Sequence, residues 1–132
     1  MSNSSSRPLS PHLSVYKMHP GMVMSGLHRI TGLALTVGLL LLVWWLVAAA
    51  AGPDSFAVVQ GVLGTWIGKL ALLGWTFSIF YHLGTGIRHI GYDLGLFLGK
   101  EGSVYAGWVV VVAALGLTAL AWAIGCAVLY VK

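Results

Sequence analysis

Acidic residues are almost absent from this chain, and charged residues of both signs make up only 8% of its 132 residues. A soluble domain of this length carries about three times as many charges, so the scarcity excludes an ordinary soluble domain. The seven Lys and Arg residues form no basic run, which argues against a nucleic-acid-binding surface. Since 58% of the residues are hydrophobic, we expect an integral membrane protein.

Cysteine is nearly absent as well, because Cys126 is the single one in the chain. One thiol excludes a disulfide within the chain, and it excludes the cysteine clusters that hold iron–sulfur centres. Cys126 lies inside a long apolar run, where a free thiol behaves as a small hydrophobic side chain. We therefore expect it to pack as an apolar residue.

Three long uncharged runs predict the architecture. Because about 20 apolar residues cross a bilayer as a helix, the chain has room for three spans joined by short loops. We predict an all-α integral membrane protein with transmembrane helices at about 28–51, 66–90 and 103–131. These helices form a membrane anchor over residues 22–132, and a polar N-terminal segment, 1–21, precedes it on the cytoplasmic side.

The loops indicate how the chain is oriented. A turn at Gly52-Pro53-Asp54 and a short interfacial helix over 55–68 are expected between the first two spans. The N-terminal side and the second loop hold five basic residues: Arg7, Lys17, Arg29, Arg88 and Lys100. The other side holds Lys69 and Lys132. Since Lys and Arg favour the cytoplasmic side, the N-terminus is expected in the cytoplasm or in a mitochondrial matrix.

The second predicted span carries a polar face, which a helix that only crosses the membrane does not require. Four residues fall within roughly 60° of one another on a helix: His82, Gly86, His89 and Asp93. Arg88 lies well off this face. Polar groups at membrane depth are costly, and the glycines near His82 thin the helix where a flat cofactor can lie. The face allows a haem bound through His82, and a hydrogen bond from His82 to a neighbouring helix is the alternative.

Spacing along the same helix extends the haem hypothesis. His89 lies two turns beyond His82, about 10.5 Å along the axis, where haem propionates would approach the interface. The candidate cationic or donor partners for propionates are His28, Arg88 and His89. With one imidazole well inside a span, the second axial ligand would come from another protein or the iron would be five-coordinate. We favour a partner chain.

A second candidate site lies at the start of the first span. Ser25 and Arg29 are an i, i+4 pair, so their hydroxyl and guanidinium groups face the same way and can hold a carbonyl-bearing head group. The alternative, favoured on spacing alone, is an interfacial Arg29 that snorkels and a Ser25 that begins the helix. Asp93 is either a helix cap or an ion-pair partner of Arg88 or Arg29.

Both constellations resemble signatures of a known family. The run RPLSPHL at 7–13, followed by S-x-x-H-R-x-T at 25–31, resembles the first signature of the cytochrome b subunit of succinate dehydrogenase, one of the two small membrane anchors of that enzyme. The run H-x-x-x-G-I-R-H-I-x-Y-D-x-G at 82–95 resembles the second signature. The resemblance extends from Arg7 to the end of the chain and includes the number of spans.

The resemblance implies a fold and a set of partners. Members of this family are three-helix anchors whose bundle is completed by a second small membrane anchor. Together the two anchors hold a flavoprotein subunit and an iron–sulfur subunit, and no nucleic acid is involved. The Ser-rich, Arg-poor N-terminus favours a bacterial inner membrane over a mitochondrial inner membrane.

The resemblance also implies a role for each matching residue. His82 corresponds to an axial ligand of haem b, whose second ligand would come from the partner anchor. Contacts to the haem propionates are implied for His28, Arg88 and His89. Ser25 and Arg29 correspond to residues that line the quinone pocket, whereas Asp93 occupies a motif position without an assigned role.

The implied activity is that of succinate:quinone oxidoreductase, in which iron–sulfur clusters pass electrons to ubiquinone or menaquinone. The chain alone should have no catalytic residue and no activity, because it has neither a flavin-binding fold nor a cysteine cluster. Two alternatives stay open. One is the anchor of a fumarate reductase, and the other is a haem-free structural or transport subunit whose polar residues join helices.

Overall fold

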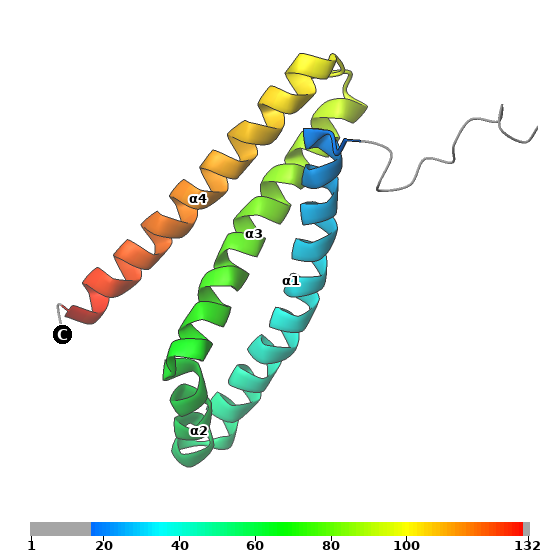
Figure 1. Cartoon of the computed structure of the whole chain (residues 1–132). Coiled ribbons are helices and arrows are strands. Elements are labelled where there is room, and N and C mark those ends of the chain that lie inside the picture. Colours follow the sequence, from blue (N-terminus) through cyan, green and yellow to red (C-terminus); the bar gives the residue numbers. More distant parts are fainter. Residues whose placement is uncertain (1–16, 131–132) are drawn as a thin grey trace, which may run out of the picture.

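The computed structural model describes residues 17–130, and this part of the chain is helical throughout apart from short connections (Figure 1). The helices are α1 (Pro20–Ala51), α2 (Pro53–Gly64), α3 (Trp66–Asp93) and α4 (Lys100–Tyr130). Residues 1–16, which include the run at 7–13 and most of the polar N-terminal segment, lie outside the described residues. The all-α fold class is confirmed.

Local sequence explains where each helix begins and ends. Proline occupies the first position of α1 and of α2, where its missing N–H costs no hydrogen bond. The imidazole of His19 accepts a hydrogen bond from the Gly21 N–H (3.2 Å), which caps α1. Gly52, with a φ of 119°, separates α1 from α2 in a conformation that side chains disfavour. The hydroxyl of Thr65 caps α3 by accepting from the Gly68 N–H (3.0 Å).

The expected number of membrane-spanning helices is confirmed, because α1, α3 and α4 are long and apolar enough to cross a bilayer. The helix α1 already begins at Pro20, before the expected span 28–51, and α3 continues to Asp93. The short helix expected over 55–68 is α2. It ends at Gly64 because the chain breaks at Thr65, and the last residues of the expected helix belong to α3.

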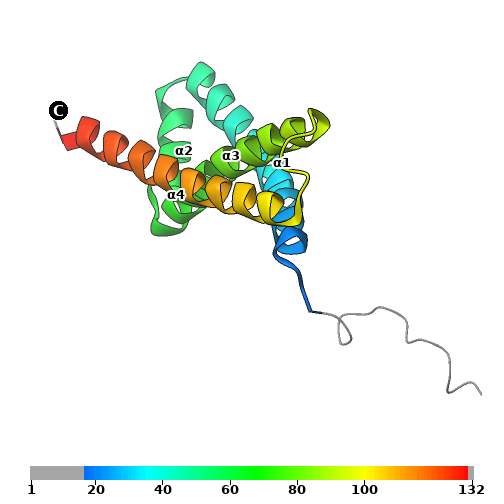
Figure 2. The same cartoon turned by 90° about the horizontal axis from the view of Figure 1, so that it is seen from above.

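The helix α3 lies between α1 and α4 and packs on both (Figure 1). Seen from above, α1 and α4 each cross α3 at an angle (Figure 2). The start of α1, the end of α3 and the start of α4 meet at one end of the molecule, and α2 lies at the opposite end (Figure 1). Residues at the start of α1 and the end of α3, although far apart in sequence, are therefore neighbours.

Glycines permit the close approach of the helices. A Cβ added to Gly38 of α1 would collide with the indole of Trp75 on α3. A Cβ on Gly84 would lie 2.9 Å from a methyl group of Val110 on α4. Small residues at such positions are typical of membrane helices, whose association depends on close van der Waals contact.

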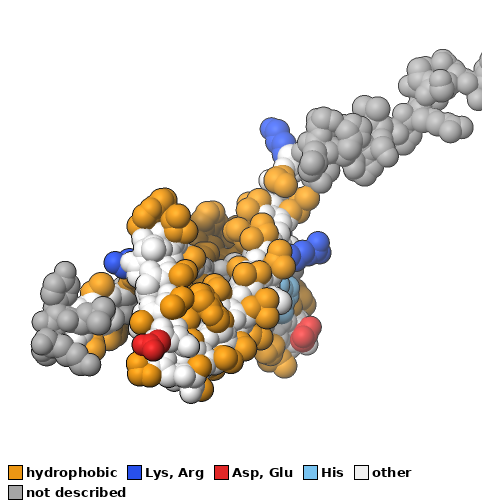
Figure 3. Space-filling view, turned by 90° about the horizontal axis from the view of Figure 1, so that it is seen from below, with side chains coloured by type: hydrophobic (Ala, Val, Ile, Leu, Met, Phe, Trp, Pro, Cys, Tyr) orange, Lys and Arg blue, Asp and Glu red, His pale blue; other side chains and the backbone are white. Residues whose placement is uncertain are grey.

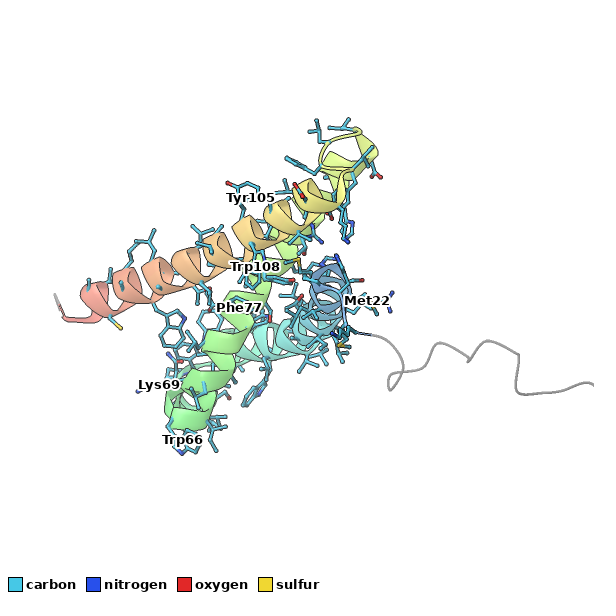
Figure 4. All side chains as sticks on the ribbon, turned by 45° about the horizontal axis from the view of Figure 1, so that its top comes forward. Met22, Trp66, Lys69, Phe77, Tyr105 and Trp108 are labelled. Carbon is cyan, nitrogen blue, oxygen red and sulfur yellow. The ribbon has the colours of Figure 1, made fainter. Side chains whose placement is uncertain are left out.

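Hydrophobic side chains cover most of the outer surface (Figure 3). Leu33, Leu40 and Val112 are 68%, 68% and 66% exposed, although all three are large and apolar. Figure 4 labels Phe77 on α3 and Trp108 on α4, and Trp66 and Lys69 mark the first turn of α3. A surface this apolar requires lipid or other membrane helices around it.

Candidate functional site

Three histidines from two helices gather at the crossing of α1 and α3. The rings of His28 and His82 are stacked, with centroids 4.0 Å apart and an interplanar angle of 11°. The ring of His89 meets His28 edge-on at 5.4 Å. Histidine side chains reach the surface at one edge of the molecule in Figure 3. The structure therefore brings together three residues that the sequence predicts as one site.

The orientation of His82 is set by α1. Its Nδ1 atom lies 3.2 Å from the carbonyl oxygen of His28 and 3.3 Å from the hydroxyl oxygen of Thr31. A carbonyl can only accept, so His82 Nδ1 carries the proton and donates it. The proton-free ring nitrogen of the neutral imidazole is then Nε2, the atom that can bind a metal.

The ring of His28 is fixed in the same way by α3. Its Nδ1 atom is hydrogen-bonded to the hydroxyl of Thr85, which is 1% exposed. That hydroxyl also lies 2.9 Å from two carbonyl oxygens of its own helix, Tyr81 O and His82 O. One of these carbonyls can take the threonine proton, which leaves the threonine oxygen free to accept from a protonated His28 Nδ1.

Two glycines shape the space around His82. A Cβ on Gly32 would lie 3.1 Å from His82 Cε1, so the imidazole rests directly on the α1 backbone at this point. A Cβ on Gly86 would have no neighbour within 4 Å. The predicted face of α3 therefore has open space beside Gly86, next to the imidazole, where a flat group can approach.

Arg88 is turned into the molecule, where α1, α3 and α4 meet. It is 8% exposed, its Nη1 lies 3.4 Å from the sulfur of Met24, and its guanidinium lies 5.4 Å from the ring centroid of Tyr92. Its Nε has no hydrogen-bond partner among residues 17–130. A Cβ on Gly107 of α4 would meet both Met24 and Arg88, so three helices enclose this cation.

The remaining predicted residues lie nearby but are exposed. Ser25 and Arg29 lie on the first turns of α1, at the same end of the molecule as the histidines, and both are exposed. Asp93 is the last residue of α3 and is also exposed. None of these three side chains belongs to the histidine cluster.

The candidate site residues predicted from the sequence do not include the hydroxyl groups that hold the rings. Thr31 and Thr85 are 4% and 1% exposed, and each contacts a histidine of the opposite helix. The sequence carries a signal for them, because Ser78, Tyr81, Thr85 and Arg88 recur at helical spacing in an apolar segment, and all four are buried. Among the described residues, no group of three or more His, Cys, Asp or Glu side chains is placed to hold a metal.

A cavity of about 960 Å³ lies at the other end of the molecule. It is lined by residues of all four helices, including Trp45, Gln60, Lys69, Trp75 and Trp122. Among the lining residues, Lys69 is labelled at the start of α3 in Figure 4. None of the histidines lines this cavity, so it is separate from the histidine cluster.

Comparison with known proteins gives this site a context. Residues 3–123 match the model of the family described as succinate dehydrogenase/fumarate reductase transmembrane subunit. The succinate dehydrogenase cytochrome b556 subunit of Paracoccus denitrificans is 45% identical over 93 residues, which cover 70% of this chain and 72% of the relative. That of Rickettsia felis is 37% identical over 116 residues, 88% of this chain and 90% of the relative.

A mitochondrial relative is more distant. The succinate dehydrogenase cytochrome b560 subunit of Sus scrofa is 36% identical over 125 residues, covering 88% of this chain and 72% of the relative. The relatives are subunits of an oxidoreductase, and the resemblance predicted from the two sequence signatures is confirmed. The chain belongs to the family of succinate dehydrogenase/fumarate reductase transmembrane subunits.

Proposed function

We propose that this chain is the haem-bearing cytochrome b anchor of succinate:quinone oxidoreductase, with His82 as one axial ligand of haem b. The observation that carries the proposal is the contact between His82 Nδ1 and the carbonyl oxygen of His28, at 3.2 Å. Metal-binding histidines almost always donate their second ring N–H to such an acceptor, which fixes the tautomer and the ring plane. The same contact leaves Nε2 available for iron.

A partner anchor supplies the second ligand in this proposal. His28 stacks face to face on His82 at 4.0 Å, so the two rings cannot bind one iron from opposite sides. The open space beside Gly86 suits a flat macrocycle between this chain and another helix. Bound haem b supplies a one-electron redox centre, and this chain contributes its position and electrostatic environment.

His28, His89 and Arg88 provide the positive or hydrogen-bonding groups for the haem propionates. His28 and His89 lie beside His82, toward the end of the molecule where α1 begins. Arg88 is a buried cation whose Nε has no partner within the described residues. A buried charge is stabilised by a compensating opposite charge, so Arg88 favours an anionic group at this end of the site.

Ser25 and Arg29 form the part of the quinone site that this chain contributes. Both lie exposed at the end of the molecule that holds the histidines. Their hydroxyl and guanidinium groups can donate hydrogen bonds to a quinone carbonyl, and neither needs to leave a buried contact first. The quinone is ubiquinone or menaquinone, and it receives electrons from the iron–sulfur subunit on the same side of the membrane.

The complete complex contains this chain, a second membrane anchor, the iron–sulfur subunit and the flavoprotein subunit. The bacterial relatives favour a bacterial inner membrane for this complex. The concentration of Lys and Arg on one side favours a cytoplasmic N-terminus. The family description also includes fumarate reductase, which would run the reaction in the opposite direction. A haem-free anchor is the second alternative.

The test is a dithionite-reduced minus oxidised absorbance spectrum of the complex purified in mild detergent. We expect a b-type band in the unaltered complex and its loss in His82→Ala. His19→Ala is the matched control, because His19 is an exposed imidazole that caps α1 and lies outside the histidine cluster. An unchanged band in His82→Ala would refute the ligand assignment. A colourless unaltered complex with all its subunits would leave only the anchor role.

A further inference from the structure

We infer that Thr31 is a positioning residue for His82, which holds the imidazole through its side-chain oxygen. This inference rests on the proposed function, in which His82 Nε2 binds haem iron. Thr31 does not touch the iron in this role. It acts on the opposite side of the ring, at Nδ1, where its oxygen lies 3.3 Å away.

The hydrogen-bond geometry assigns the direction of this contact. The Thr31 oxygen lies 2.9 Å from two carbonyl oxygens of α1, Leu27 O and His28 O. Those carbonyls take the single hydroxyl proton of Thr31, so its oxygen presents lone pairs to His82. The N–H of His82 is therefore shared between two acceptors of α1, the His28 carbonyl and the Thr31 hydroxyl.

The residues around the His82 imidazole restrict its position. Thr31 is 4% exposed, so its hydroxyl is shielded from solvent. The neighbouring residue is Gly32, whose missing side chain leaves room for the imidazole edge, since a Cβ there would lie 3.1 Å from Cε1. The stacked ring of His28 limits rotation out of the plane. Of the groups that hold the His82 ring, only the Thr31 hydroxyl can be removed by a substitution that keeps the shape of the side chain.

The electronic consequence follows from the direction of the hydrogen bond. A hydrogen-bond acceptor at Nδ1–H polarises the N–H bond and increases the electron density of the ring, which makes Nε2 a stronger electron donor to a metal. A stronger donor stabilises ferric over ferrous iron and lowers the reduction potential. Removing the Thr31 oxygen should therefore raise the haem midpoint potential and alter the ligand field of the iron.

The test compares three variants in the assembled complex. Thr31→Val keeps the β-branched shape and removes the hydroxyl, Thr31→Ser keeps the hydroxyl, and Thr36→Val is the matched control. Thr36 lies further along the same helix, and its exposed hydroxyl donates to Gly32 O (3.1 Å) without contacting a histidine. The readouts are haem content, midpoint potential by redox titration and the low-spin ferric EPR signal.

We expect a raised potential and shifted EPR signal in Thr31→Val, and unaltered values in Thr31→Ser and Thr36→Val. Loss of haem in Thr31→Val, with haem and potential retained in Thr31→Ser, would also support the inference. It is overturned if Thr31→Val keeps the potential and the EPR signal of the unaltered complex, or if Thr31→Ser and Thr36→Val change them equally. Failure of the proposed function gives a different result, a complex without haem or a band that survives His82→Ala.

Discussion

Replacement of Gly38 by alanine is expected to weaken the packing of α1 on α3. The added methyl group would collide with the indole ring of Trp75, whose Nε1 is buried and has no hydrogen-bond partner among residues 17–130. Overpacking of a close contact costs about 1–3 kcal/mol. A glycine-to-alanine change inside a helix also gains up to about 1 kcal/mol of helix propensity, so a single variant does not isolate the collision.

Gly26→Ala supplies the comparison, because Gly26 lies in the same helix and its added Cβ would have no neighbour within 4 Å. Both variants gain the same helix propensity, and the difference between them measures the collision. We expect the free energy of unfolding of Gly38→Ala to lie about 1–3 kcal/mol below that of Gly26→Ala. Thermal unfolding of the complex in detergent, followed by circular dichroism, gives the comparison.

A second substitution tests the cause. Trp75→Phe shortens the side chain that the new methyl group meets, so Gly38→Ala should cost less in the Trp75→Phe background than in the unaltered chain. A double-mutant cycle expresses this difference as a coupling free energy. Equal stability of Gly38→Ala and Gly26→Ala, or additive effects in the cycle, would refute the view that Trp75 on Gly38 sets the distance between α1 and α3.

Two further predictions concern the end of the molecule that holds the histidines. Arg29→Ala should lower the rate of quinone reduction about tenfold or more, because hydrogen bonds to charged groups contribute about 1.5–3 kcal/mol. Succinate oxidation with a soluble dye as electron acceptor should be retained. Equal loss of both activities would point to failed assembly. Tyr92→Phe removes the 2.8 Å hydrogen bond between the Tyr92 and Ser103 hydroxyls and should cost about 1 kcal/mol of unfolding free energy. Tyr105→Phe, at a tyrosine that is 71% exposed, should cost less, and the reverse order would contradict the packing of α3 on α4.

The membrane spans can be predicted from the sequence because the bilayer imposes a simple requirement, an uncharged helix of sufficient length. The start of α1 at Pro20 is less visible from hydropathy, since Lys17 and Arg29 bracket the first turns and interrupt the apolar pattern. The cap formed by His19 and the proline that follows it determine that start, and they are features of local chemistry rather than of hydropathy.

The grouping of His28, His82 and His89 also follows from the sequence, through helical spacing and through the antiparallel order of the spans. The hydrogen-bond partners of these histidines cannot be predicted from the sequence. The acceptor for His82 is a backbone carbonyl of another helix, and no side-chain pattern encodes which carbonyl a crossing helix will meet. Spacing places Arg88 off the histidine face, but its burial depends on where α1 brings Met24 and where α4 brings Gly107.

The hydrogen bonds between α1 and α3 also fix the alignment of two helices that lipid alone would allow to slide. His28 of α1 is hydrogen-bonded to Thr85 of α3, and His82 of α3 is hydrogen-bonded to the His28 carbonyl and to Thr31 of α1. Each helix therefore contributes a histidine side chain that contacts the other helix. A shift of α3 by one turn, about 5.4 Å, would break every one of these contacts at once and leave polar groups unpaired in an apolar medium. One alignment of the two helices is therefore strongly preferred over its neighbours, and the contacts that set this preference all lie within this chain.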